Sequence, residues 1–436
     1  MNEITTLLIY LHPLLDSSTF RQLTLITEAL LIMTGRVTQL SISRWTEKGG
    51  SYRTIHRFFQ KNIPWDKLNW QLVKHSLPKD LGVILIGGDA TTVTKSGKET
   101  YGLGKFFSSI YSRAVSGLGF QCLSLIEVER RISWPIMMQQ ISPPPKKKKP
   151  VKTRRNKINR GRGRPKGSKN KNHREVKLNT EMTQVKGMLE KLLKLIGETL
   201  KPIYFVYDGA FGNNAAVQMT RQVGLHLISK LRNNSALYFQ WDGVYSGKGR
   251  RPIYGERVDY NHLPTSHLKS DETKENIRTC IYQLTVIHKK FADKLNVVVI
   301  LKENTKTGKV ARVLLFSTDL SLEWDKIIDY YRLRFQIEFN FRDAKQHWGL
   351  EDFMSVKEQS VFNSANLSLF MVNVSQAMLM TLNQESVLDM KARYHALRYA
   401  REIFKILPEN MKPINIEPLF KKIPVLGLIH DEKIAA

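Results

Sequence analysis

The segment from Tyr331 to Lys345 constrains this chain most, because one predicted helix carries two different stripes. At about 3.6 residues per turn, an apolar stripe covers an arc of about 80°. It consists of Tyr330, Leu333, Ile337, Phe341 and Ala344. A polar stripe beside it covers roughly 60°. It consists of Tyr331, Arg334, Glu338 and Lys345, with Arg342 at its edge. A helix that only faced solvent would scatter its charges, so one acid among bases predicts a metal ligand beside a bound polyanion.

The charge balance also indicates a polyanionic partner. The chain of 436 residues has a net charge of +29, and 42% of its residues are hydrophobic, which is enough for two or three domains. Residues 143–177 hold 16 Lys and Arg against one Glu and so supply +15, while the rest of the chain carries +14. Such an excess favours nucleic acid over a membrane surface. The predicted partner is double-stranded DNA.

The apolar segments predict a soluble protein with no membrane contact. The most apolar stretch, 361–382, is interrupted by polar residues, which predicts a buried core helix and not a span. These residues are Asn363, Asn366, Asn373 and Gln376. No basic region precedes Leu7–Leu15, so a signal peptide is not expected. Cys122 and Cys280 make neither a disulfide framework nor a zinc site. The expected location is the cytoplasm, in association with the nucleoid.

Residues 1–78 are predicted to form a helical DNA-binding domain. Helical spacing of apolar residues runs over Phe20–Ile32 after the capping candidates Asp16, Ser17 and Ser18. A further segment, Leu40–Trp45, precedes a Gly49-Gly50 break and a helix from Ser51 that exposes Arg53 and Arg57. This order is typical of a helix-turn-helix reader of DNA. The alternative is a plain helical bundle.

Two acids follow predicted strands. Val83–Ile86 is an apolar run bounded by glycines, and Asp89 follows it closely. Strand-like alternation continues over 123–128 and 132–137, and an apolar helical pattern covers 183–200. A second buried strand, Ile203–Tyr207, ends at Asp208. Strands, a helix, a strand with an acid at its end, and a late helix with an acid are typical of the RNase H-like order.

The interval from Asp208 to Glu338 is too long for one connection within a compact core. We therefore expect a subdomain over 226–317, with strands near 236–239, 279–287, 296–301 and 310–316. The predicted organisation is a helical domain 1–78, core parts 79–142, 178–225 and 318–405, a basic insert 143–177, a β-rich insertion 226–317 and a tail 406–436.

The spacing of Tyr331, Arg334, Glu338 and Lys345 resembles a known signature. It is similar to the Tyr-Arg-Glu-Lys signature of bacterial insertion-sequence DDE transposases, which are cut-and-paste enzymes. The resemblance covers about 80–400, with motifs at three points. It implies an α/β fold in which an RNase H-like catalytic core carries a β-rich insertion and an N-terminal helical DNA-binding domain.

The resemblance also implies a catalytic triad of Asp89, Asp208 and Glu338. Asp89 stands in an Asp-x-Thr context after Gly88, where many relatives have a second Asp, and Asp208 stands in Tyr-Asp-Gly. A lone Asp after a strand is more often a turn or cap residue, but three acids in this order favour catalysis. Carboxylate oxygens suit hard cations, and two-metal cleavage of a phosphodiester needs shared and outer ligands. The implied cofactors are two Mg²⁺ or Mn²⁺ ions held by these three acids.

Several further residues are candidate DNA ligands. Arg334 and Lys345 are predicted to bind phosphates, with Arg342 beside them, and Tyr331 can hydrogen-bond a phosphate. Trp241 is a candidate for stacking on a flipped base, as the resemblance implies, although a tryptophan in a β-rich subdomain is more often a core residue. Lys95 and Lys98, with Lys105, either line a DNA channel or belong to a solvated hairpin.

The basic insert 143–177 is rich in Pro and Gly and nearly free of apolar residues, which predicts disorder. Its centre, Gly163-Arg164-Pro165, is flanked by Arg162 and Lys166 and resembles an AT-hook, in which arginines follow the floor of the A·T minor groove. The alternative is a polycation that binds phosphates without preference.

The sequence therefore predicts a transposase that cleaves transposon ends and transfers the strands into target DNA. The resemblance implies a hairpin intermediate and a homodimer within a synaptic complex. Two alternatives remain open. One is a catalytically inactive, transposase-derived protein that binds AT-rich DNA, and the other is a metal-dependent DNA nuclease without strand transfer.

Overall fold

The computed structural model describes residues 2–46, 49–108, 112–141, 172–245, 247, 249–382 and 386–407. The chain is a mixed α/β protein that divides into two compact units. Unit 1 comprises residues 1–141, 188–201 and 334–436, and unit 2 comprises residues 142–187 and 202–333.

Unit 1 begins with helices whose starts are set by side-chain caps. The Asp16 carboxylate accepts a hydrogen bond from the Thr19 amide at 2.9 Å, and the Ser51 hydroxyl accepts one from the Thr54 amide at 3.4 Å. The predicted helices after these residues are therefore confirmed. The elements are α1 (Asn2–Leu8), the 3₁₀ helix η1 (Ile9–Leu14), α2 (Ser17–Ile32), α3 (Gln39–Trp45), α4 (Tyr52–Phe58) and α5 (Trp65–Ser76).

The sheet of unit 1 is antiparallel. Its strands are β1 (Ile84–Thr94), β2 (Gly104–Ser108), β3 (Arg113–Glu127) and β4 (Ile132–Ile141). Strand β3 pairs with β1 along one edge and with β4 and β2 along the other. The sequence predicted that the first strand ends before Gly87-Gly88, and this was wrong. Because every residue of β1, from Ile84 to Thr94, is paired with β3, Asp89 lies within the strand, opposite Cys122.

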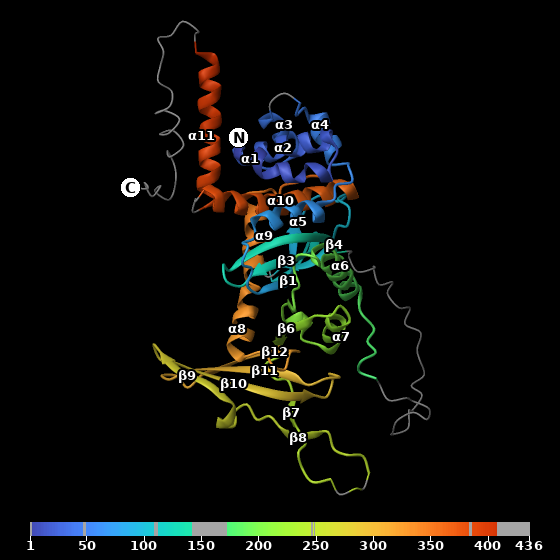
Figure 1. The fold of residues 1–436 in the computed structure, drawn as a ribbon, viewed down its shortest axis with the longest axis vertical. Coiled ribbons are helices and arrows are strands. Elements are labelled where there is room, and N and C mark those ends of the chain that lie inside the picture. The colour runs from blue at the N-terminus through green and yellow to red at the C-terminus, as the bar shows by residue number, and fades with distance from the viewer. Residues whose placement is uncertain are drawn as a thin grey trace. The chain divides into compact units, whose positions relative to one another are not determined.

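The long helix α10 (Glu358–Leu382) forms the centre of unit 1. It lies between helices α1–α4 and the sheet (Figure 1), and Asn363, Asn366 and Asn373 are all at most 2% exposed. The Asn373 amide donates to the Pro135 carbonyl at 2.7 Å and to Asn69 Oδ1 at 2.9 Å. The prediction of a buried core helix is thus confirmed, because the Nδ2 group of each of these asparagines donates hydrogen bonds inside the unit. No helix in the described part of the chain is long and apolar enough to cross a membrane.

Two more helices complete unit 1, namely α9 (Gln336–Gln346) and α11 (Val387–Ile406). Helix α6 (Thr180–Ile196) crosses the boundary between the units at residues 187 and 188. It ends earlier than the predicted Leu200, since the chain turns at Gly197.

Unit 2 is built on a mixed sheet. Strand β5 (Tyr204–Val206) is parallel to β6 (His226–Leu231), and the antiparallel strands β12 (Val310–Ser317), β11 (Leu295–Asn304) and β10 (Ile277–His288) follow in that order. Strand β10 also pairs with β9 (Leu268–Lys274) and with β7 (Leu237–Gln240), which pairs with β8 (Tyr254–Arg257). The four strands predicted in the insertion are therefore confirmed.

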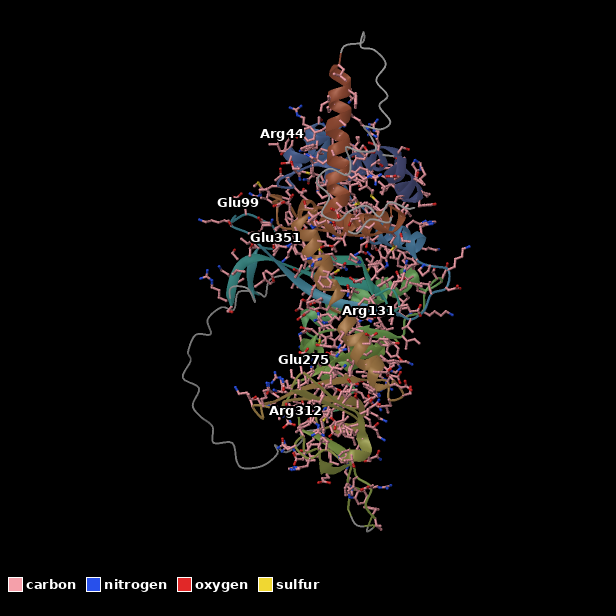
Figure 2. The ribbon with its side chains drawn as sticks, turned by 90° about the vertical axis from the view of Figure 1, so that its left-hand side faces the viewer. Arg44, Glu99, Arg131, Glu275, Arg312 and Glu351 are labelled. Carbon is pink, nitrogen blue, oxygen red and sulfur yellow. The ribbon has the colours of Figure 1, made fainter. Side chains whose placement is uncertain are left out.

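The remaining elements of unit 2 are η2 (Gly209–Phe211), α7 (Asn214–Gln222), η3 (Thr265–His267) and α8 (Trp324–Leu333). The β-rich part carries basic side chains on exposed strands. Arg312 of β12, labelled in Figure 2, donates to the Asn233 carbonyl at 2.9 Å and lies over the Tyr260 ring at 4.1 Å.

Candidate active site

Asp89 is positioned by the centre of β1. Its Oδ1 accepts a hydrogen bond from the Ala90 amide at 2.8 Å, and its carbonyl accepts one from the Gln121 side chain at 3.0 Å. The opposite residue on β3 is Cys122, which is fully buried. Burial, and secondarily the nearby Asp89 charge, raises the pKa of the Cys122 thiol to about 12. Asp89 therefore lies beside a neutral thiol. The second carboxylate oxygen of Asp89, Oδ2, accepts a hydrogen bond from Arg334.

Glu338 is positioned by α9, and the helix that carries it differs from the predicted one. The sequence predicted a continuous helix over Tyr331–Lys345, but α8 ends at Leu333 and α9 begins at Gln336. The Ile337 and Glu338 amides donate to the Arg334 and Phe335 carbonyls, both at 3.0 Å. These bonds to the third preceding residue tighten the chain into a turn between the helices.

The apolar stripe is confirmed despite this break. Its five members are at most 7% exposed: Tyr330, Leu333, Ile337, Phe341 and Ala344. Those on α9 belong to unit 1 and fix the helix against the sheet. A Cβ atom on Gly87 of β1 would lie 2.7 Å from Ile337 Cδ1 and 2.5 Å from Ile126 Cδ1, so a side chain at this position would have to displace the ends of these two isoleucines. Close packing at Gly87 brings Glu338 to the strand that bears Asp89.

Arg334 joins the two acids. Its Nη1 lies 2.5 Å from Asp89 Oδ2, and its Nη2 lies 3.2 Å from Glu338 Oε1. The Arg334 side chain is only 13% exposed, and the carboxylates are 18% and 42% exposed. A strand acid and a helix acid thus converge on one cation. This donor set fits a divalent metal ion, because hard cations prefer carboxylate oxygen. In the described residues, no group of three or more His, Cys, Asp or Glu side chains is placed to hold a metal.

Lys345 and Lys95 are both engaged within unit 1. The Lys345 ammonium donates to the Thr92 carbonyl at 3.0 Å and lies 3.3 Å from the Glu351 carboxylate, which Figure 2 labels. The Lys95 ammonium donates to the carbonyls of Glu351 at 2.9 Å and Phe353 at 2.7 Å, and it lies over the Phe353 ring at 3.7 Å. Burial lowers the pKa of Lys95 to about 8. Both lysines tie the end of β1 to the loop after α9, which the sequence did not indicate.

The other cations and the phenol of the predicted site lie in different surroundings. Arg342 is exposed, 3.2 Å from the Asp343 carboxylate and 4.8 Å above the Phe339 ring. Lys98 is exposed, and Tyr331 is half-buried in the last turn of α8. Their roles as DNA ligands stay predictions. Arg162, Arg164 and Lys166 lie outside the described residues.

Asp208 belongs to unit 2 and lies two residues after the end of β5. Its carboxylate caps η2 by accepting from the Ala210 amide at 3.0 Å, and its carbonyl accepts from the Ser229 hydroxyl at 2.6 Å. Sequence reasoning missed a second acid near it, Glu181 of α6. Burial first, and the Asp208 charge second, raise the pKa of Glu181. The signal for Glu181 was only an acid in the first turn of a helix, which is common.

Trp241 lies directly after β7, with its side chain half-buried and the Arg251 guanidinium 5.7 Å from its ring. It is thus not a fully buried core residue. Its predicted role in stacking on a base stays a prediction.

Comparison with known families gives one match, which covers more than half of the chain. Residues 10–284 match the family described as DDE superfamily endonuclease. This chain belongs to that family. The match contains Asp89 and Asp208 and ends before Glu338. For a DDE superfamily endonuclease, the family implies phosphodiester hydrolysis, a DNA substrate and divalent metal ions. No curated protein matches the chain.

Proposed function

We propose that this DDE endonuclease is an insertion-sequence transposase with an RNase H-like core. It cuts double-stranded DNA at transposon ends and joins those ends to target DNA. The observation that carries the proposal is the convergence of Asp89 and Glu338 on one guanidinium, since acids brought together from a strand and a packed helix can hold the metal ions of a phosphoryl-transfer site. The Tyr-Arg-Glu-Lys spacing supports the transposase assignment.

In this proposal Asp89, Asp208 and Glu338 hold two Mg²⁺ or Mn²⁺ ions. When bound, such ions lower the pKa of the attacking water and stabilise the leaving 3′ oxygen. The three carboxylates orient the ions, and the strand and helix that carry two of them fix the carboxylate positions. Arg334 and Lys345 bind phosphates near the scissile bond, with the arginine as a planar fork and the lysine as a point charge.

The remaining predicted roles belong to later steps. Tyr331, Arg342 and Lys98 contact the DNA backbone, while Trp241, beside Arg251, stacks on a base displaced during hairpin formation. Two copies of the chain act together in a synaptic complex that holds both transposon ends.

A joining assay tests the transposase proposal. Purified protein with Mg²⁺ is incubated with labelled DNA that carries the short inverted repeats flanking its gene, together with a supercoiled target plasmid. We expect end cleavage followed by labelled, joined plasmid. Cleavage without joining would instead identify a nuclease. Binding without cleavage, at both Mg²⁺ and Mn²⁺, would identify a catalytically inactive DNA-binding protein.

We also propose that the basic insert is a tethered minor-groove binder. Its composition and the Gly163-Arg164-Pro165 centre support this reading. Deleting residues 146–174 is expected to weaken DNA affinity and flatten its salt dependence, because many cations leave the interface.

The double substitution Arg162→Ala with Arg164→Ala separates the two modes of binding for this insert. Groove reading predicts that the preference for A·T-rich over G·C-rich duplex is lost, beyond a small uniform weakening. Competition binding at two salt concentrations measures both quantities. Equal weakening on both duplexes would show a plain polycation.

A further inference from the structure

The position of Arg334 has a consequence for how metal ions reach the site. Its guanidinium lies between the two carboxylates that we propose as metal ligands, at 2.5 Å from Asp89 Oδ2 and 3.2 Å from Glu338 Oε1. The side chain is largely enclosed, with 13% of its surface exposed. Arg334 therefore occupies the place in which these two acids would share a metal ion.

Electrostatics explains why a cation is held there. Two partly enclosed carboxylates repel each other, and a planar guanidinium offers both of them hydrogen bonds in one fork. A divalent ion that enters between Asp89 and Glu338 must therefore break both contacts. Arg342, which pairs with Asp343 on the same helix, has no contact with either acid among the interactions of the described residues.

We infer that Arg334 is an internal competitor of the metal, a role that rests on the proposed function. In the DNA-free protein its guanidinium holds Asp89 and Glu338 together and weakens divalent-metal binding. A DNA phosphate that takes over the guanidinium frees both carboxylates. DNA and metal then strengthen each other's binding, since a coupling between two ligands acts equally in both directions. The competition keeps the site from assembling before DNA arrives.

Mn²⁺ binding to the full chain tests this inference without any measurement of catalysis. Free Mn²⁺ is followed by electron paramagnetic resonance during titration of wild-type protein, Arg334→Gln, Arg334→Lys and Arg342→Gln. We expect Arg334→Gln to bind Mn²⁺ more tightly by about three- to tenfold, because the competing ion pairs are gone. Arg334→Lys keeps a cation but loses the forked guanidinium, so its Mn²⁺ affinity should lie between those of wild type and Arg334→Gln. The Mn²⁺ affinity of Arg342→Gln should match that of wild type.

A second titration in the presence of a short random-sequence duplex measures the coupling. In wild type the duplex should tighten Mn²⁺ binding, and in Arg334→Gln this gain should be smaller. Urea unfolding of each metal-free variant shows that it is folded. Unchanged or weaker Mn²⁺ binding by folded Arg334→Gln overturns the inference and leaves a purely structural ion pair.

Asp89→Asn separates this failure from failure of the proposed function. If Asp89→Asn abolishes Mn²⁺ binding while Arg334→Gln leaves it unchanged, only the competition is wrong. If Asp89→Asn binds Mn²⁺ as wild type does, or if no variant binds it, the carboxylate metal site itself is wrong and both proposals fail.

Discussion

Asp89→Asn and Glu338→Gln should each reduce metal-dependent DNA cleavage by at least about a thousandfold. Both substitutions keep the side-chain volume and remove a charge with which the proposed site would hold its metal ions. DNA affinity should be kept or slightly increased, because one negative charge leaves a strongly basic protein. Single-turnover cleavage of end DNA and a parallel binding titration measure the two effects separately.

The matched control for this experiment is Asp343→Asn. Asp343 lies on α9 with Glu338, but its carboxylate pairs with the exposed Arg342 and not with Arg334. Cleavage by this control should stay close to wild type. If Asp89→Asn cuts at a rate near that of the control, the assignment of Asp89 to the metal site is wrong.

The largest expected effect on stability comes from Asn363→Leu in α10. The Asn363 side chain is fully buried and donates to the carbonyls of Phe59 at 2.9 Å and Lys61 at 2.8 Å. It also accepts a hydrogen bond from the Trp65 indole at 2.8 Å. Leucine has the same branching at Cγ but is larger and cannot form hydrogen bonds, so it leaves these buried groups without this partner. We expect a loss of about 3 kcal/mol or more in the free energy of unfolding.

Urea unfolding of the full chain measures this loss, with Asn62→Leu as the control. Asn62 is exposed in the same region of unit 1, and its replacement should change the free energy by less than about 0.5 kcal/mol. Equal midpoints for the two variants would mean that the Asn363 network does not hold α10 to the N-terminal helices.

The sequence predicted the elements of the site better than their limits. Apolar spacing at Ile337, Phe341 and Ala344 identified the buried face of α9, because burial follows helical periodicity. The same spacing could not show the break after Leu333, since a tight turn preserves it and no glycine or proline stands there. The glycines Gly87-Gly88 predict a strand end, whereas pairing with β3 continues the strand beyond Asp89. The low strand propensity of the two glycines is thus overridden by the pairing of β1 with β3.

The contacts of the cations were beyond the reach of sequence reasoning. Lys95 donates to two backbone carbonyls that lie more than 250 residues further along the chain. Every residue has a backbone carbonyl, so the residue types do not indicate which carbonyls accept these hydrogen bonds. The sequence predicts that Arg334 binds phosphate, and in the structure Arg334 forms ion pairs with Asp89 and Glu338. Charge pattern shows that cations and acids gather, but it does not show which partner each cation takes before DNA binds.

The absence of a side chain at Gly87 bears on how copies of this gene are judged. A comparison of sequences that looks only for Asp89, Asp208 and Glu338 does not test the space between β1 and α9. Any side chain at residue 87 would meet the ends of Ile126 and Ile337, so these isoleucines would have to change their rotamers, and a bulkier residue would press on the face of α9 that carries Ile337. A related sequence could thus keep Asp89, Asp208 and Glu338 and still hold Glu338 in a different position, because of a residue that takes no part in the proposed chemistry.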